Sequence, residues 1–117
     1  MSRIIKFRAW DDSWAFQNGT GKMIYDYKHI FDTKFIVMQY TGLKDKNGLD
    51  IYEGDLVHYI RKDNTSFDND YERTFEIVWQ DGMFIGKDSQ IKIRDIAGEN
   101  SEVIGNIYEN TNKNISI

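Results

Sequence analysis

The two histidines, and the aspartates beside one of them, are the first residues with the potential to do chemistry. His29 stands between Asp26 and Asp32, whereas His58 stands alone much further along the chain. A zinc site usually takes two or three nitrogen or thiolate ligands at close spacing. The chain has no such cluster and no cysteine, so we predict a loop histidine, a strand histidine and no metal ligand.

A pair of carboxylates, Glu53 and Asp55, flanks Gly54. Two carboxylates can do acid–base chemistry when their surroundings push their pKa values apart. The alternative is structural: an aspartate after a glycine turn hydrogen-bonds backbone amides and starts the next strand. We favour the structural interpretation and assign no catalytic residue.

The sequence also lacks the motifs of phosphate binding and of nucleophilic catalysis. Residues 18–22, NGTGK, contain two glycines and a lysine but not the full strand–GxxxxGK[ST]–helix pattern of a phosphate loop. Neither a GxSxG motif nor a kinase motif is present. We therefore predict that the protein is not an enzyme and takes no cofactor.

Aromatic and basic residues are the more promising group for binding. Trp10 lies beside Arg8, and further aromatic and basic residues follow in the N-terminal part. Such residues could stack on the bases of single-stranded nucleic acid or of a nucleotide, or they could pack in a core or an oligomer interface, which we favour. The residues that we nominate for ligand or partner binding are Arg8, Trp10, Tyr40, Tyr52, Glu53, Asp55, Asp68 and Asp70.

Composition and charge narrow the class of protein further. The chain has 117 residues, of which 40% are hydrophobic and 15% aromatic, which suits one domain or two small subdomains. The lack of cysteine, of a signal-peptide core and of a long apolar run predicts a cytoplasmic protein with no membrane contact. Residues 46–117 hold eight Lys or Arg against fourteen Asp or Glu, a net charge that repels nucleic-acid phosphates.

Short strands separated by turns account for most of the chain. Asn47-Gly48, Gly54-Asp55 and Asp81-Gly82 are turn signals, and the last one predicts a two-residue hairpin between residues 74–79 and 83–85. Further strands are predicted at 4–10, 23–27, 35–41, 56–60, 91–93 and 102–108, and a polar loop at 62–72. The predicted core comprises Ile51, Leu56, Val57, Ile77, Trp79, Phe84, Ile104 and Ile107.

Three segments carry a family resemblance: IKFRAWD at 5–11, MQYTGLKDKNGLDIYEGDLV at 38–57 and VIGNIYEN at 103–110. Together they resemble the YopX family of bacteriophage and prophage proteins. The resemblance implies an α+β fold that is mostly β. It implies an N-terminal α+β subdomain over residues 1–45 and a C-terminal SH3-like β-barrel over 46–117. It implies no catalytic residues.

These observations leave three hypotheses for function. The first is a non-enzymatic phage accessory protein in the cytoplasm of a bacterial host, which binds a host or phage protein and forms a homo-oligomer. The loop that carries Asp68 and Asp70 is one surface for that partner. The second is nucleic-acid or nucleotide binding through the basic and aromatic N-terminal part, and the third is a phosphoesterase that uses Glu53 and Asp55 with a metal ion.

Overall fold

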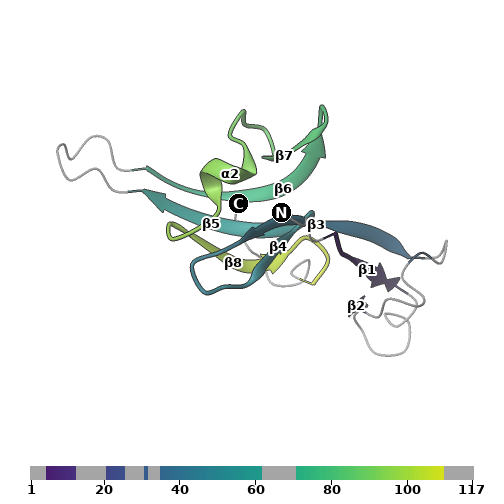
Figure 1. The fold of residues 1–117 in the computed structure, drawn as a ribbon. Helices are drawn as coiled ribbons and strands as arrows, with labels where there is room; N and C mark the ends of the chain where they lie inside the picture. Colours follow the sequence, from purple (N-terminus) through teal and green to yellow (C-terminus); the bar gives the residue numbers. More distant parts are fainter. Residues whose placement is uncertain (1–4, 13–20, 26–30, 32–34, 62–70, 110–117) are drawn as a thin grey trace.

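The computed structural model describes residues 5–12, 21–25, 31, 35–61 and 71–109. These residues form strands and one short helix, α2 (Figure 1). The prediction of a mostly-β fold is confirmed. In chain order the elements are β1 (Phe7–Asp11), β2 (Lys22–Ile24), β3 (Ile36–Lys44), β4 (Asp50–Tyr52), β5 (Asp55–Arg61), β6 (Tyr71–Gln80), β7 (Met83–Gly86), α2 (Ile93–Ile96) and β8 (Ser101–Asn106).

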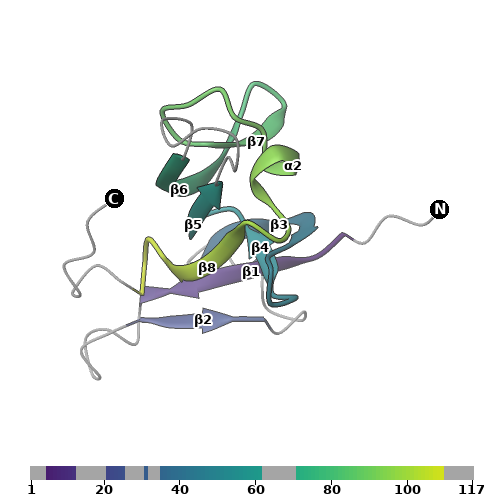
Figure 2. The same cartoon turned by 90° about the vertical axis from the view of Figure 1, so that its left-hand side faces the viewer.

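The strands make two four-stranded antiparallel sheets. The first has the order β2-β1-β3-β4 and the second the order β7-β6-β5-β8. Figure 2 shows the β1–β2 pair on one side of the molecule and β5, β6 and β7 on the other. Both sheets are open over the described residues, so closure into a five-stranded SH3-like barrel is not shown.

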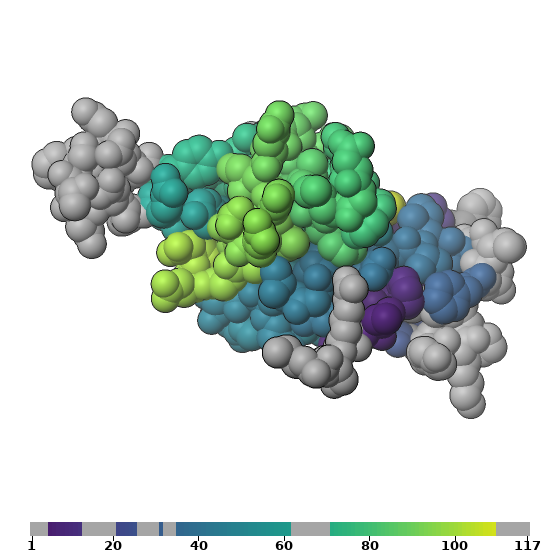
Figure 3. Space-filling view, turned by 45° about the horizontal axis from the view of Figure 1, so that its top comes forward, coloured from purple at the N-terminus to yellow at the C-terminus, as the bar shows by residue number. Residues whose placement is uncertain are grey.

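The predicted boundary between residues 45 and 46 falls in the connection between two paired strands. Tyr40 of β3 pairs with Tyr52 of β4, and Lys44 pairs with Asp50. The turn at Gly48, whose φ is +80°, brings these strands together. The space-filling view shows green residues lying directly against blue residues (Figure 3), and α2 contacts β3 of the first sheet. A division into two subdomains, the first of them α+β, is therefore not shown and stays a prediction.

The main core lies in the second sheet and under α2. Strand alternation turns Phe75 and Ile77 of β6 inward, and both are fully buried. Ile93 and Ile96 are three residues apart, so they lie on the same face of α2 and reach the same core. The buried cluster consists of Ile51, Val57, Phe75, Ile77, Phe84, Ile93 and Ile96.

Two of the predicted core residues are exposed, and the prediction is wrong for them. Trp79 is 52% exposed and makes an edge-to-face ring contact with Phe84, one residue before the end of β6. Ile104 is 40% exposed. It is the extra residue of a β-bulge, since Val57 pairs with Val103 and Leu56 pairs with Gly105.

The predicted hairpin at Asp81-Gly82 is confirmed. Both residues have positive φ, 54° and 80°, as a type I′ turn requires. The predicted strand at 91–93 is wrong in most of its length, because only Lys92 bridges Ile85 before α2 begins at Ile93. No helix within the described ranges is long and apolar enough to cross a membrane.

Replacing Gly86 by alanine should destabilise the fold. A Cβ atom at this position would collide with the Phe75 ring, which is itself fully buried and cannot move aside. We expect Gly86→Ala to lower the free energy of unfolding by about 1–3 kcal/mol, as measured by urea denaturation. Lys87→Ala, at the exposed neighbouring position, is the control and should change it little. Equal unfolding midpoints for Gly86→Ala and the wild type would contradict this packing.

Candidate ligand pocket between two strand edges

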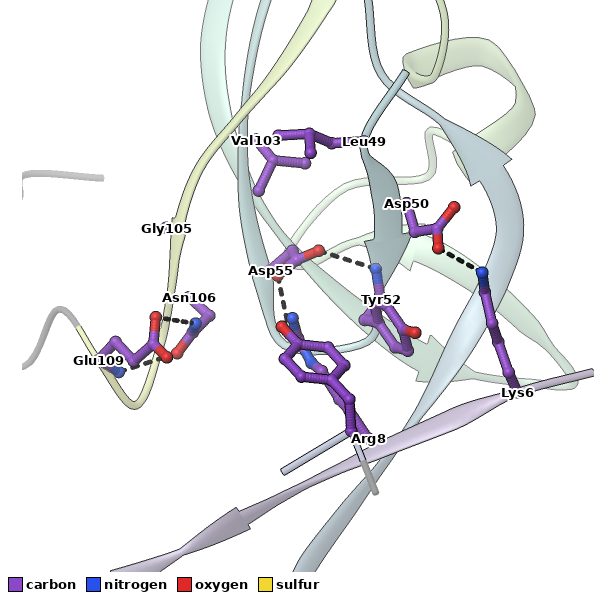
Figure 4. Close-up of a pocket in the computed structure, with 11 residues that line it drawn as sticks. Lys6, Arg8, Leu49, Asp50, Tyr52, Asp55, Val103, Gly105, Asn106 and Glu109 are labelled. Atoms are coloured by element: carbon purple, nitrogen blue, oxygen red, sulfur yellow. Dashed lines mark hydrogen bonds and ion pairs between the residues drawn. The ribbon is translucent and has the colours of Figure 1, made fainter. Parts of the chain in front are cut away.

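A pocket of about 500 Å³ opens where the two sheets meet. Its walls are β4 and β8, which are outermost strands of their sheets. Figure 4 shows Arg8 of β1 and Asp55 of β5 between these walls. Over the part of the chain that the structure describes, no backbone hydrogen bond joins β4 to β8, so the two strand edges face each other across the opening.

A buried ion pair between Arg8 and Asp55 lies at the base of the pocket. The Arg8 Nη2 atom donates to Asp55 Oδ1 at 2.7 Å, and the two side chains are 4% and 2% exposed. The second carboxylate oxygen accepts the Tyr52 amide at 2.8 Å. The guanidinium also lies 4.6 Å from the centre of the Tyr52 ring and donates to the Glu53 carbonyl at 3.3 Å. These contacts supply hydrogen bonds that compensate the loss of water around the two buried charges.

The turn at Gly54 puts Asp55 in reach of the Tyr52 amide. Gly54 has a φ of +89°, which a glycine adopts without strain. Its amide donates to the Ile77 carbonyl at 2.7 Å, and its carbonyl accepts the Ile107 amide at 3.0 Å. The turn is therefore tied to both β6 and the end of β8.

Burial sets the protonation of the central groups. It raises the pKa of Asp55, while the Arg8 guanidinium and the Tyr52 amide act in the opposite direction. Burial also raises the pKa of Tyr52 to about 12, with a further contribution from Asp50. Tyr52 is therefore a neutral phenol at physiological pH, which suits a stacking and hydrogen-bonding wall rather than a base.

A surface ion-pair cluster forms the β4 rim of the pocket. Asp50 binds Lys6 through one oxygen and Lys44 through the other, the latter at 2.6 Å. Lys6 also lies 4.5 Å from the centre of the Tyr40 ring. Burial raises the pKa of Asp50, but the hydrogen bonds from Lys44 and Lys6 outweigh it, so the pKa lies below its usual value.

Asp45 connects the β3–β4 loop to β8. Its Oδ1 atom accepts the amides of Asn47 and Leu49, both at 2.9 Å, and its Oδ2 atom accepts the Val103 amide at 2.8 Å. Asp45 is not among the residues nominated from the sequence. The Asp-x-Asn-Gly pattern is typical of the local hydrogen bonds, but Val103 is 58 positions away and nothing local predicts that contact.

Asn106 organises the opposite end of the pocket and was also missed. Its side-chain oxygen accepts the amides of Tyr108 and Glu109 at 3.0 and 2.8 Å, and its Nδ2 atom donates to the Glu109 carboxylate at 2.9 Å. The Tyr108 ring stacks on Trp10, with 5.5 Å between ring centres. Trp10 thus supports this end of the pocket from behind.

The pocket brings together several of the residues nominated from the sequence. Arg8, Tyr52 and Asp55 line it. Tyr40 packs behind Tyr52, with ring centres 5.6 Å apart. Trp10 is 4% exposed and does not line the pocket. Three of the eight nominated residues therefore line this candidate pocket, and their role in binding stays a prediction.

The remaining nominated residues lie elsewhere. The Glu53 side chain accepts a long hydrogen bond of 3.4 Å from the Gln39 amide. Asp68 and Asp70 lie outside the described residues, as does His29. His58 lies on β5 and contacts Glu72 at 2.8 Å. Within the described ranges no three His, Cys, Asp or Glu residues form a group that could hold a metal ion.

Comparisons with known proteins show a matching family model and a similar solved structure. A family model described as YopX protein matches residues 12–113. The crystal structure of protein EF1440 from Enterococcus faecalis has 28% sequence identity and a TM-score of 0.61, over 96% of this chain and 99% of that chain. No curated protein matches this chain. The structural likeness extends over both sheets rather than one of them.

Removing the Asp55 charge should lower the free energy of unfolding far more than removing an exposed charge. Asp55→Asn leaves the Arg8 guanidinium buried without a counter-ion, so we expect the free energy of unfolding to fall by about 3–5 kcal/mol. Asp88→Asn, at an exposed position, is the matched control. Adding Arg8→Met to Asp55→Asn should recover part of the loss in a double-mutant cycle. If Asp55→Asn and Asp88→Asn unfold at the same urea concentration, the ion pair does not hold the fold together.

The Asp50 cluster should make stability depend on pH in the acid range. The pKa of Asp50 is lowered by folding, so its contribution is present above the unfolded value of about 3.9 and is lost as the pH falls through the folded value. We expect Asp50→Asn to have a lower melting temperature than the wild type at pH 7. At acid pH, where Asp50 is protonated, the two melting temperatures should be the same. A difference in melting temperature that is the same at every pH would contradict this assignment.

Proposed function

The chain belongs to the YopX protein family, and we propose that it acts by binding a partner protein rather than by catalysis. In this proposal it is an accessory protein of a bacteriophage or prophage, and the partner is a protein of the host or the phage. The phage origin is supported by the three segments that resemble the family. The binding role is supported by the geometry of the pocket.

The observation that carries the proposal is the pair of strand edges that face each other across the pocket. A strand at a sheet edge pairs with an extended segment of another chain. The Tyr52 and Val103 amides on these edges already donate to Asp55 and Asp45, so such a segment would pair by donating its own amides to carbonyls of the edges. Leu49 and Tyr25, which also line the pocket, are 53% and 61% exposed and add apolar surface. Backbone pairing together with exposed apolar side chains is the combination that peptide-binding surfaces use.

The carboxylates near the pocket support binding over catalysis. A general base must have an oxygen within hydrogen-bond reach of the proton that it takes. Both oxygens of Asp55 already accept hydrogen bonds, from Arg8 and from the Tyr52 amide. The Asp55 carboxylate therefore acts as a structural acceptor in this arrangement.

Binding of nucleic acid or a nucleotide through the N-terminal residues is the competing hypothesis. Arg8 and Trp10 are 3% and 4% exposed, and Lys6 is engaged with Asp50. Contacts to phosphates need accessible cations, and stacking needs accessible rings. The geometry at these positions favours a protein partner.

Affinity capture with matched variants tests the proposal. The tagged chain is incubated with nuclease-treated bacterial lysate, with and without phage induction, and bound proteins are identified by mass spectrometry. We expect one or a few proteins to be retained by the wild type and by Met83→Glu, on β7 away from the pocket. Leu49→Glu should reduce their recovery by about fivefold or more, since it puts a charge at the pocket rim.

Three outcomes would overturn the proposal. The first is capture of nucleic acid alone from a parallel lysate without nuclease, and the second is equal recovery of the same proteins by both variants. The third is the absence of any bound protein apart from copies of the chain itself. We also propose that the chain forms a homo-oligomer, because its edge strands need cover; sedimentation without lysate measures this association separately.

A further inference from the structure

The two walls of the pocket differ in charge. On the β4 side, Asp50 is paired with two lysines, Lys6 and Lys44. At the β8 side, Glu109 is exposed, and no cation among the described residues pairs with its carboxylate. The Arg8–Asp55 pair between the walls is neutral as a unit. The pocket is therefore positive at one rim and negative at the other.

Backbone donors next to the negative wall are already in use. The Val103 amide donates to Asp45, and the Glu109 amide donates to the side chain of Asn106. Across the pocket, the Tyr52 amide donates to Asp55. What this wall offers a ligand is acceptors, above all the Glu109 carboxylate. A ligand group that fits there must donate hydrogen bonds and carry positive charge.

The base of the pocket is buried. Arg8 is 3% exposed, and its guanidinium donates to Asp55 and to the Glu53 carbonyl. Arg8 is therefore out of reach of a ligand, and Glu109 is the group on which a cationic ligand would bind.

Apolar and aromatic surface lies between these polar groups. Leu49 and Val103 face each other from the two walls in Figure 4. The Tyr25 ring is exposed and packs its edge against Tyr52 at 6.0 Å between ring centres. Methylene groups of a long side chain can pack on the first pair, and a cation can lie over an exposed tyrosine ring.

We propose that the pocket receives an arginine side chain from an extended segment of a partner protein, with its guanidinium on Glu109. This inference rests on the proposed function and names the chemistry of the partner. Arginine is preferred to lysine because its planar guanidinium binds a carboxylate through two donors and stacks on tyrosine, which a compact ammonium does less well.

Short blocked peptides test the proposal on the full chain. Acetyl-Gly-Arg-Gly-amide is titrated into the ¹⁵N-labelled protein, and amide shifts are followed by NMR, beside peptides with lysine, with glutamate, or with citrulline, the neutral isostere of arginine. We expect shifts at Gly105 and Glu109 with arginine, weaker ones with lysine, and none with glutamate or citrulline. Affinity should fall as salt is raised, since the contact is partly exposed.

Two matched variants check the role of Glu109. Glu109→Gln should lower the affinity for the arginine peptide by roughly three- to tenfold, as expected for one carboxylate contact that is partly exposed to water. Glu99→Gln removes the same charge from an exposed position outside the pocket and should leave the affinity unchanged. Both variants should have the melting temperature of the wild type, which would show that a loss of binding does not come from unfolding.

The outcomes separate this inference from the proposed function. If citrulline binds as well as arginine, or if both variants bind alike, the inference is wrong, and capture of a partner that depends on Leu49 still supports protein binding. If the arginine peptide binds as expected but no partner protein is ever captured, the pocket chemistry is supported and the proposed function is overturned.

Discussion

A buried ion pair, Arg8 with Asp55, connects β1 of the first sheet to β5 of the second, in addition to the backbone hydrogen bond that joins the β3–β4 loop to Ser101 of β8. Burying both charges is costly, and their mutual attraction offsets that cost only when the remaining hydrogen-bonding capacity is also met. Here the second Asp55 oxygen accepts the Tyr52 amide, and the Tyr52 ring lies against the guanidinium. The pair therefore also contacts β4, and a displacement of β1, β4 or β5 would break some of its contacts.

The pocket exists because carboxylates at this junction accept backbone amides that a neighbouring strand would otherwise pair with. Asp55 accepts an amide from the edge of β4, and Asp45 accepts one from the edge of β8. Each aspartate therefore satisfies a backbone donor that a neighbouring strand would otherwise have to meet. The edges can remain apart without leaving these donors unpaired, and the space between them is the pocket. Fold and candidate site depend on the same two side chains.

Local signals in the sequence predicted local structure well. Asp81-Gly82 specified its hairpin, and Gly54-Asp55 specified a turn followed by a strand, because the backbone angles at such glycines depend on little else. The centre of the site was accessible too, since Arg8, Tyr52 and Asp55 stood out by type. The contact of Asp45 with Val103 and the bulge at Ile104 were not predictable. They depend on the register between distant strands, which alternation within one strand does not encode.

The sequence distance within the Arg8–Asp55 pair has a consequence for the order of events during synthesis. Arg8 precedes its partner by 47 positions, and β8, the last strand, completes the second sheet. A nascent chain that has not yet exposed β8 to solvent holds β5 as an unprotected sheet edge with Leu56 and Val57 beside it. Contacts between such distant segments form slowly. The native junction can therefore form only after β8 has left the ribosome, and until then the exposed β5 edge is the region that chaperones would need to shield.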